Sequence, residues 1–170
     1  FFRRAISYLS CTHHVQLDVA KYIERLSDSA AGGHYNHHAR MVEASSMGSL
    51  HLGVEIVWKT HMLRPLLYAQ ACCTAVQSSD ALDLVDAIRR QQVFMCKVLA
   101  VEADAYDEAT ALAGYASFMR RARALRGSEA SVLEPELMVD LVWHTHMQAP
   151  NRYKDDCVQM VGFILDHNDE

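Results

Sequence analysis

One segment of this chain occurs twice, at residues 54–72 and again at 139–157, with a constant offset of 85 residues. Over 53–72 against 138–157, nine of twenty positions are identical, and both tryptophans of the chain are among them. In the first copy the identical residues are Val54, Val57, Trp58, Thr60, His61, Met62, Pro65, Tyr68 and Cys72. Identity at so many rare residues indicates an internal duplication, so we expect two related units.

Apolar spacing along the chain predicts helices. The apolar residues at 15, 19, 23 and 26 are three or four apart, which is the period of a helix face. Gly and Pro are scarce, and no alternating run of β-branched and aromatic residues indicates a strand. We therefore predict an all-α protein of about seven helices without a sheet. The candidate helical segments number eight, of which 35–47 is the weakest, and they lie at about 15–26, 35–47, 54–62, 66–75, 81–101, 108–125, 135–147 and 150–165.

The duplication also predicts the domain organisation. The first unit is expected at residues 1–78, with its motif at 53–72. The second is expected at 79–170, with its motif at 138–157. A chain of 170 residues is the length of one ordinary domain, so we expect the two units to pack as one compact globular body.

The residues common to both copies predict a corner between two helices. His61 and His146 each follow a Trp by three residues and precede a Pro by four. The residue before a proline disfavours the helical region, whereas proline suits the first position of a new helix. We expect each His to pack on the Trp and either to accept a hydrogen bond from the free amides of the next helix or to bond the hydroxyl of the motif Tyr seven residues later. This structural motif comprises Trp58, His61, Pro65, Tyr68, Trp143, His146, Pro150 and Tyr153.

The sequence before each motif repeats more faintly. Tyr35 and His38 precede the first motif much as Tyr115 and Phe118 precede the second. The spacing from Tyr to Trp is 23 residues in one copy and 28 in the other, which predicts a loop of different length.

His144 is a position at which the two copies carry different basic residues. It lies two residues before His146, about 200° around a helix, so the two imidazoles cannot share a metal ion. Lys59 stands there in the first copy, four residues after Glu55, as His144 stands four after Asp140. We interpret both pairs as exposed acid–base pairs on a helix surface. The alternative is a general base at His144 that Asp140 orients.

Two kinds of site therefore stay open as alternatives. An acid–base or metal-dependent enzyme would have as its candidate catalytic residues Asp140, His144, His146 and Tyr153. The weak candidates for zinc ligands are His34, His38, His144 and His146, of which the first two have the spacing of ligands on one helix face. We predict no cofactor, with zinc as the alternative, since no phosphate-binding loop or nucleophile elbow occurs.

The net charge and the number of cysteines restrict the kinds of partner and the cellular compartment that we expect for this chain. The net charge of −5 argues against nucleic-acid binding, and the arginines between 120 and 126 are expected to form a solvated helix face. Five cysteines, an odd number, predict buried thiols in a reducing compartment, either the cytoplasm or an organelle interior after removal of a targeting peptide. No apolar run approaches the ~20 residues of a membrane span. The start at Phe1 leads us to expect a processed chain or part of a longer one.

The second half of the chain resembles a known family. The elements that carry the resemblance are residues 83–94, Tyr115, Phe118, the second motif and the closing Asp166-His167-Asn168-Asp169. In this order they resemble the glycine-rich domain-containing protein-like family, and residues 13–75 resemble it more faintly. Lys59 departs from the family's Trp-His-x-His element, and the glycine-rich tail is absent. The resemblance implies no established catalytic activity.

We therefore predict a non-catalytic helical interaction or scaffold module, an accessory component of a larger protein assembly with other proteins as its partners. A metal-dependent or acid–base enzyme centred on the second motif is the first alternative. An RNA-associated protein that uses the arginines between 120 and 126 is the second.

Overall fold

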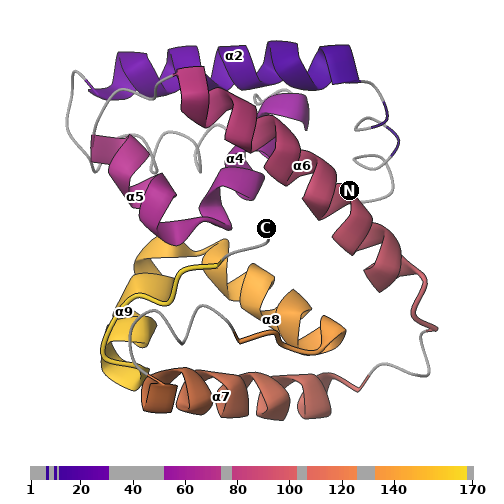
Figure 1. Cartoon of the computed structure of the whole chain (residues 1–170), viewed down its shortest axis with the longest axis vertical. Coiled ribbons are helices and arrows are strands. Elements are labelled where there is room, and N and C mark those ends of the chain that lie inside the picture. Colours follow the sequence, from indigo (N-terminus) through magenta and orange to yellow (C-terminus); the bar gives the residue numbers. More distant parts are fainter. Residues whose placement is uncertain are drawn as a thin grey trace. The chain divides into compact units, whose positions relative to one another are not determined.

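The computed structural model describes residues 7, 10, 12–30, 52–73, 78–102, 107–125 and 133–167. This part of the chain contains seven helices and no strand, which confirms the all-α prediction (Figure 1). The helices are α2 (Thr12–Ala30), α4 (Leu52–Met62), α5 (Pro65–Cys73), α6 (Ser78–Leu99), α7 (Glu108–Leu125), α8 (Leu137–Met147) and α9 (Pro150–Met160). Among the described helices none has the length and apolarity needed to cross a bilayer. The helix predicted at 35–47 falls outside the described residues.

The chain divides into two compact units. Unit 1 comprises residues 1–61 and 67–95, and unit 2 comprises residues 62–66 and 96–170. Each unit thus contains one copy of the motif helix, α4 in unit 1 and α8 in unit 2. The sequence placed the boundary between 78 and 79, at the start of α6, whereas α6 as far as Met95 groups with unit 1.

Local chemistry explains where α7 begins and where α8 gives way to α9. The Asp107 carboxylate accepts hydrogen bonds from the amides of Ala109 and Thr110, at 3.3 and 3.1 Å, and so caps α7. A hydrogen bond from the Thr110 hydroxyl, together with these amide bonds, holds the pKa of Asp107 below its usual value. Ala149 leaves the helical region with φ −117° and ψ 71°, and Pro150 opens α9.

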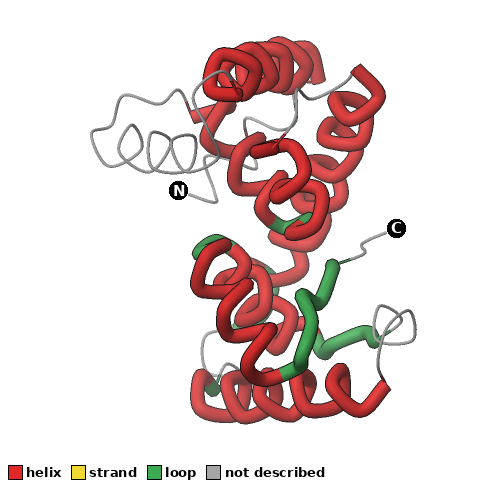
Figure 2. The backbone as a smooth tube through the Cα atoms, turned by 90° about the vertical axis from the view of Figure 1, so that its left-hand side faces the viewer, coloured by secondary structure: helices red, strands yellow, loops and turns green. Residues whose placement is uncertain are grey.

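Helix α9 ends earlier than the sequence pattern predicted. The prediction ran to Leu165, but α9 stops at Met160. Gly162 has φ +94°, a conformation that glycine adopts readily, and its amide and that of Val161 both bond the Cys157 carbonyl. The chain from 161 to 167 is consequently a loop that leads away from the helix (Figure 2).

Unit 2 has a well-defined apolar core. The buried residues that form it are Leu63, Phe118, Met119, Ala122, Val139, Trp143, Met147, Tyr153, Cys157, Val161 and Leu165. Helix α7 approaches α8 closely at Gly114, where an added Cβ would lie 2.7 Å from Cγ2 of Val139. The burial of Cys157 agrees with the expectation of a structural thiol, whereas Cys96 on α6 is exposed, so the prediction of buried thiols was wrong for that residue.

Unit 1 buries the corresponding face of its motif helix. On α4 the residues Val54, Val57 and Trp58 are almost fully buried, and so are Val19 and Tyr22 on α2. The motif helices of both units therefore direct their Trp into a core, as a packing role requires.

Candidate functional site

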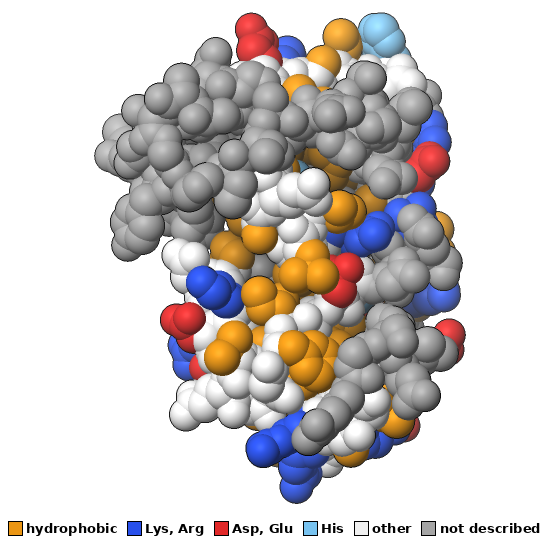
Figure 3. All heavy atoms as spheres, turned by 60° about the vertical axis from the view of Figure 1, so that its left-hand side comes forward, with side chains coloured by type: hydrophobic (Ala, Val, Ile, Leu, Met, Phe, Trp, Pro, Cys, Tyr) orange, Lys and Arg blue, Asp and Glu red, His pale blue; other side chains and the backbone are white. Residues whose placement is uncertain are grey.

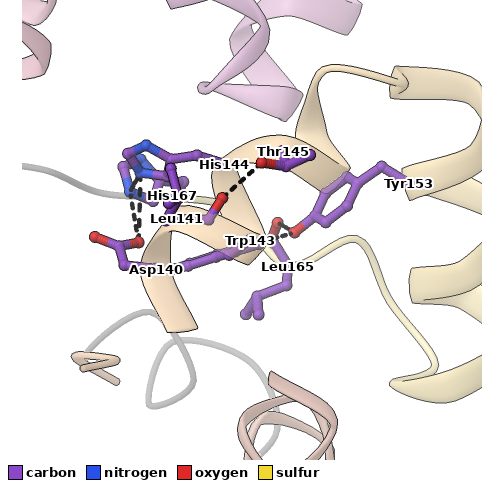
Figure 4. Close-up of polar contacts among 8 residues, drawn as sticks. All are labelled: Asp140, Leu141, Trp143, His144, Thr145, Tyr153, Leu165 and His167. Atoms are coloured by element: carbon purple, nitrogen blue, oxygen red, sulfur yellow. Dashed lines mark hydrogen bonds and ion pairs between the residues drawn. The ribbon is translucent and has the colours of Figure 1, made fainter. Parts of the chain in front are cut away.

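The motif Trp and Tyr of unit 2 form a buried hydrogen-bonded chain (Figure 4). Trp143 Nε1 donates to the Tyr153 hydroxyl at 2.9 Å, and this hydroxyl donates to the Leu165 carbonyl at 2.6 Å. Burial raises the pKa of Tyr153 far above its usual value, so the phenol stays protonated. In unit 1, Trp58 Nε1 donates to the Tyr68 hydroxyl at 3.3 Å, which is the same bond.

The shared histidine bonds a tyrosine in each unit. His146 Nδ1 lies 2.8 Å from the Tyr115 hydroxyl, and His61 Nδ1 lies 3.0 Å from the Tyr22 hydroxyl. His146 also donates from Nε2 to Asp156 at 3.1 Å, so its Nδ1 accepts the Tyr115 proton when the imidazole is neutral. Burial lowers the pKa of His146, and Asp156 opposes that effect.

Each histidine does bond a Tyr hydroxyl, but the tyrosine belongs to another helix, Tyr22 on α2 or Tyr115 on α7, and is not the motif tyrosine that the sequence predicted. The sequence paired Tyr35 with Tyr115, whereas Tyr22 on α2 makes the contact that Tyr115 makes on α7. Tyr35 lies outside the described residues. The imidazoles of His61 and His146 also meet the motif tyrosines edge-on, with ring centroids 5.3 and 5.1 Å apart.

His144 lies in a buried cluster rather than on an exposed surface, which corrects the prediction for the second copy. Its Nε2 is 3.0 Å from Nε2 of His167 and 3.4 Å from Oδ1 of Asp140 (Figure 4). His167 Nε2 is 3.9 Å from the same carboxylate oxygen. Both histidine side chains are 8% exposed and that of Asp140 is 21% exposed.

The first copy keeps the surface ion pair that the sequence predicted. Lys59 Nζ lies 3.0 Å from Oε1 of Glu55, and the lysine side chain is 37% exposed. The difference between the copies is therefore one of burial as well as of residue type.

Burial sets the protonation state of His144. It lowers the pKa of this imidazole to about 3, and the neighbouring His167 adds to the effect. His144 is thus uncharged at neutral pH.

The structure separates the candidate catalytic residues instead of bringing them together. His144 faces Asp140 and His167, whereas His146 faces Tyr115 and Asp156. This agrees with the geometric argument that two histidines at this spacing cannot share a ligand. Tyr153 is bonded to Trp143 and Leu165 within the core. His34 and His38 lie outside the described residues.

His167 is the site residue that sequence reasoning missed. It lies 23 residues after His144, in the loop that follows α9, and residue spacing within a helix cannot reveal such a contact. The closing Asp-His-Asn-Asp element, which contributed to the family resemblance, was the available signal.

A separate cleft of about 770 Å³ lies in unit 2 at the ends of α7 and α9. Its described lining residues are Arg120, Arg123, Ala124, Val158, Gln159, Val161, Gly162 and Phe163. The cleft falls within the usual size range of ligand pockets. Two of the arginines predicted to form a solvated face therefore border a concave surface next to apolar side chains. Figure 3 shows basic and apolar side chains on the face of the molecule that includes α9.

Comparison with known proteins identifies the family. The sequence model described as glycine-rich domain-containing protein-like matches residues 70–156, just over half of the chain. The chain belongs to this family. It is 35% identical over 103 residues to glycine-rich domain-containing protein 1 of Arabidopsis thaliana and 30% identical over 99 residues to protein 2 of the same plant. Each match covers 56% of this chain and 12% of the relative, so the match spans a small part of either plant protein. No solved structure gives a significant match.

Proposed function

We propose that the chain is a non-catalytic helical interaction module that binds an acidic protein segment in the cleft between the ends of α7 and α9. The observation that carries this proposal is the lining of the cleft, which combines the guanidinium groups of Arg120 and Arg123 with apolar side chains. The module would act as one component of a larger protein assembly.

The internal bonding of the motif supports a non-catalytic role. The Trp–Tyr bond and the His–Tyr bond recur in both units, as expected of residues that maintain a fold. An acid–base enzyme at the second motif would need an activated group. Burial instead raises the pKa of Tyr115 and Tyr153, which disfavours the nucleophilic phenolate.

The chemistry of the cleft favours a peptide that is both acidic and apolar. Arginine binds carboxylates with paired N–H donors and also packs against apolar groups, which makes it common at protein interfaces. The side chain of Arg120 is oriented by bonds from Nη2 to Ser117 Oγ at 2.9 Å and from Nε to the Ala116 carbonyl at 3.3 Å. Val158, which also lines the cleft, is 54% exposed and available for contact.

The size of the relatives also supports a module. The matched segment is 12% of each plant protein, so related sequences occur within much longer chains. A short helical unit within such a chain suits binding to another protein segment. RNA would use the same arginines, but the net charge of −5 weakens attraction to a phosphate backbone.

A binding assay with charge-matched probes tests this function. The probes are a short labelled peptide of alternating Glu and Leu, its twin with Gln in place of Glu, and an oligouridylate of equal length. We expect the acidic peptide to bind most tightly, and Arg120→Glu with Arg123→Glu to weaken it about tenfold or more.

Arg121→Glu provides the matched control, because Arg121 is exposed on the same helix and does not line the cleft. It should leave the affinity for the acidic peptide nearly unchanged. The proposal would be overturned by tighter binding of the oligouridylate, by equal binding of the two peptides, or by an equal loss in Arg121→Glu.

A further inference from the structure

We propose that Asp140, His144 and His167 bind one divalent transition-metal ion of the zinc class, which fastens the C-terminal loop to α8. This inference goes beyond the proposed binding function and does not depend on it. The three side chains come from two separate segments, and one ligand atom of each lies within 4.8 Å of the others.

The separations of these atoms match those of ligands around a single ion. Ligand atoms at about 2.0–2.1 Å from a tetrahedral zinc ion are about 3.3–3.4 Å from one another. The three separations here are 3.0, 3.4 and 3.9 Å. Shifts of a few tenths of an ångström in the side chains would bring all three to that value.

The ligand types select the class of metal. Two imidazoles and one carboxylate suit zinc or ferrous iron, whereas magnesium and calcium prefer sites built from oxygen alone. Imidazole binds a metal ion in its neutral form through a ring nitrogen. The partly exposed side of the cluster is that of Asp140, so a water molecule can complete the coordination there.

Comparison with the first copy shows why a cation belongs here. In unit 1 the ammonium group of Lys59 supplies the positive charge beside Glu55. In unit 2 that lysine is replaced by His144, and the two Nε2 atoms at 3.0 Å leave room for only one proton between them. A divalent ion would supply the charge that the lysine supplies in the other copy.

Neighbouring contacts hold the loop in the orientation that the site needs. The His167 ring meets the Trp143 ring edge-on, with ring centroids 4.9 Å apart. Two residues before His167, the Leu165 carbonyl accepts a hydrogen bond from the Tyr153 hydroxyl. Between them, Asp166 accepts a hydrogen bond from the Leu66 amide at 3.4 Å. These contacts hold the segment that carries His167 beside α8.

Calorimetric titration of the full chain, stripped of metal with a chelator, tests the site. We expect one zinc ion to bind at this cluster and magnesium to give no binding. Asp140→Asn, His144→Lys and His167→Gln should each weaken zinc binding by about 100-fold or more, because even loss of an outer contact costs about 10–100-fold. Circular dichroism checks that each variant keeps its helical content.

Two controls separate this cluster from the other histidines. His13→Gln alters an exposed histidine on α2 and should not change zinc affinity. His34→Gln with His38→Gln should also leave it unchanged. Zinc binding that survives in both His144→Lys and His167→Gln, or that disappears in the His34/His38 variant, would overturn the proposal.

X-ray absorption at the zinc edge of the unaltered chain gives a test that does not depend on the folding of any variant. The expected spectrum shows nitrogen and oxygen ligands with outer-shell scattering from two imidazoles. A spectrum with sulfur ligands, or with oxygen ligands alone, would contradict the assignment.

Discussion

In unit 1 and in unit 2, a Trp–Tyr and a His–Tyr hydrogen bond hold the corner after the motif helix. The two units differ in the side chain that lies beside the equivalent acidic residue, Glu55 or Asp140. In unit 1 a half-exposed lysine pairs with Glu55. In unit 2 a buried histidine faces Asp140 and a second histidine from the C-terminal loop. Architecture is therefore common to both copies, whereas the cluster that we propose as a metal site lies in the second copy alone among the described residues.

Removal of Phe118 should break the core of unit 2 most severely. This ring is fully buried, and its centroid lies 4.7 Å from that of Trp143. Phe118→Ala should lower the free energy of unfolding by about 3–5 kcal/mol. Urea unfolding followed by fluorescence in a Trp58→Phe background, where only Trp143 reports, measures the change. An effect below about 1 kcal/mol would show that the ring is not part of a close-packed core.

Loss of the Tyr153 hydroxyl should have the next largest effect. Tyr153→Phe leaves the Trp143 indole N–H and the Leu165 carbonyl without this partner inside the core. Because a buried polar group deprived of its bond costs about 1–3 kcal/mol, we expect a loss of about 2–4 kcal/mol. The same fluorescence assay applies, and Tyr68→Phe, read from Trp58, gives the matched measurement in unit 1. Unchanged stability in both variants would show that the repeated Trp–Tyr bond does not hold the corner.

Filling the close approach between α7 and α8 should cost less. Gly114→Ala places a methyl group 2.7 Å from Cγ2 of Val139, so either this side chain or one of the helices must shift. Overpacking of this kind costs about 1–3 kcal/mol. The thermal midpoint should fall, and a second change, Val139→Ala, should recover part of the loss. No recovery in the double variant would indicate that steric crowding at this contact is not the cause.

Exchange of the acid–base pair in unit 1 should have the smallest effect. Glu55→Asp together with Lys59→His installs the residues of the second copy, and exposed pairs of this kind contribute only about 0.3–0.5 kcal/mol. The exchange should change stability by no more than that, and it should add no zinc site, because the counterpart of His167 is missing from the described part of unit 1. A second zinc ion bound by this variant would show that the motif helix alone specifies the site.

The sequence predicted the helices and the motif corner well because both depend on local spacing. Helix α7 begins and ends at the predicted residues, and Pro150 opens α9 as predicted. The tyrosine partners of the two histidines could not be found from spacing, since Tyr22 precedes His61 by 39 residues whereas Tyr115 precedes His146 by 31.

The cluster around His144 was hidden for a different physical reason. The apolar pattern after Pro150 continues beyond Met160, but Gly162 takes a positive φ and ends the helix. Because α9 ends early, the seven residues 161–167 can return toward α8 and place His167 beside His144. The sequence had predicted His144 on the helix surface. The sequence of the motif alone cannot show that a segment beyond α9 buries His144.

The most direct test of the account is a zinc titration of the chain followed through the NMR resonances of its histidine side chains. The account predicts that zinc perturbs the imidazoles of His144 and His167 together, while those of His61 and His146 keep their shifts because they hold the corners of the fold. Perturbation of His61 or His146, or no response at His144 and His167, would contradict it.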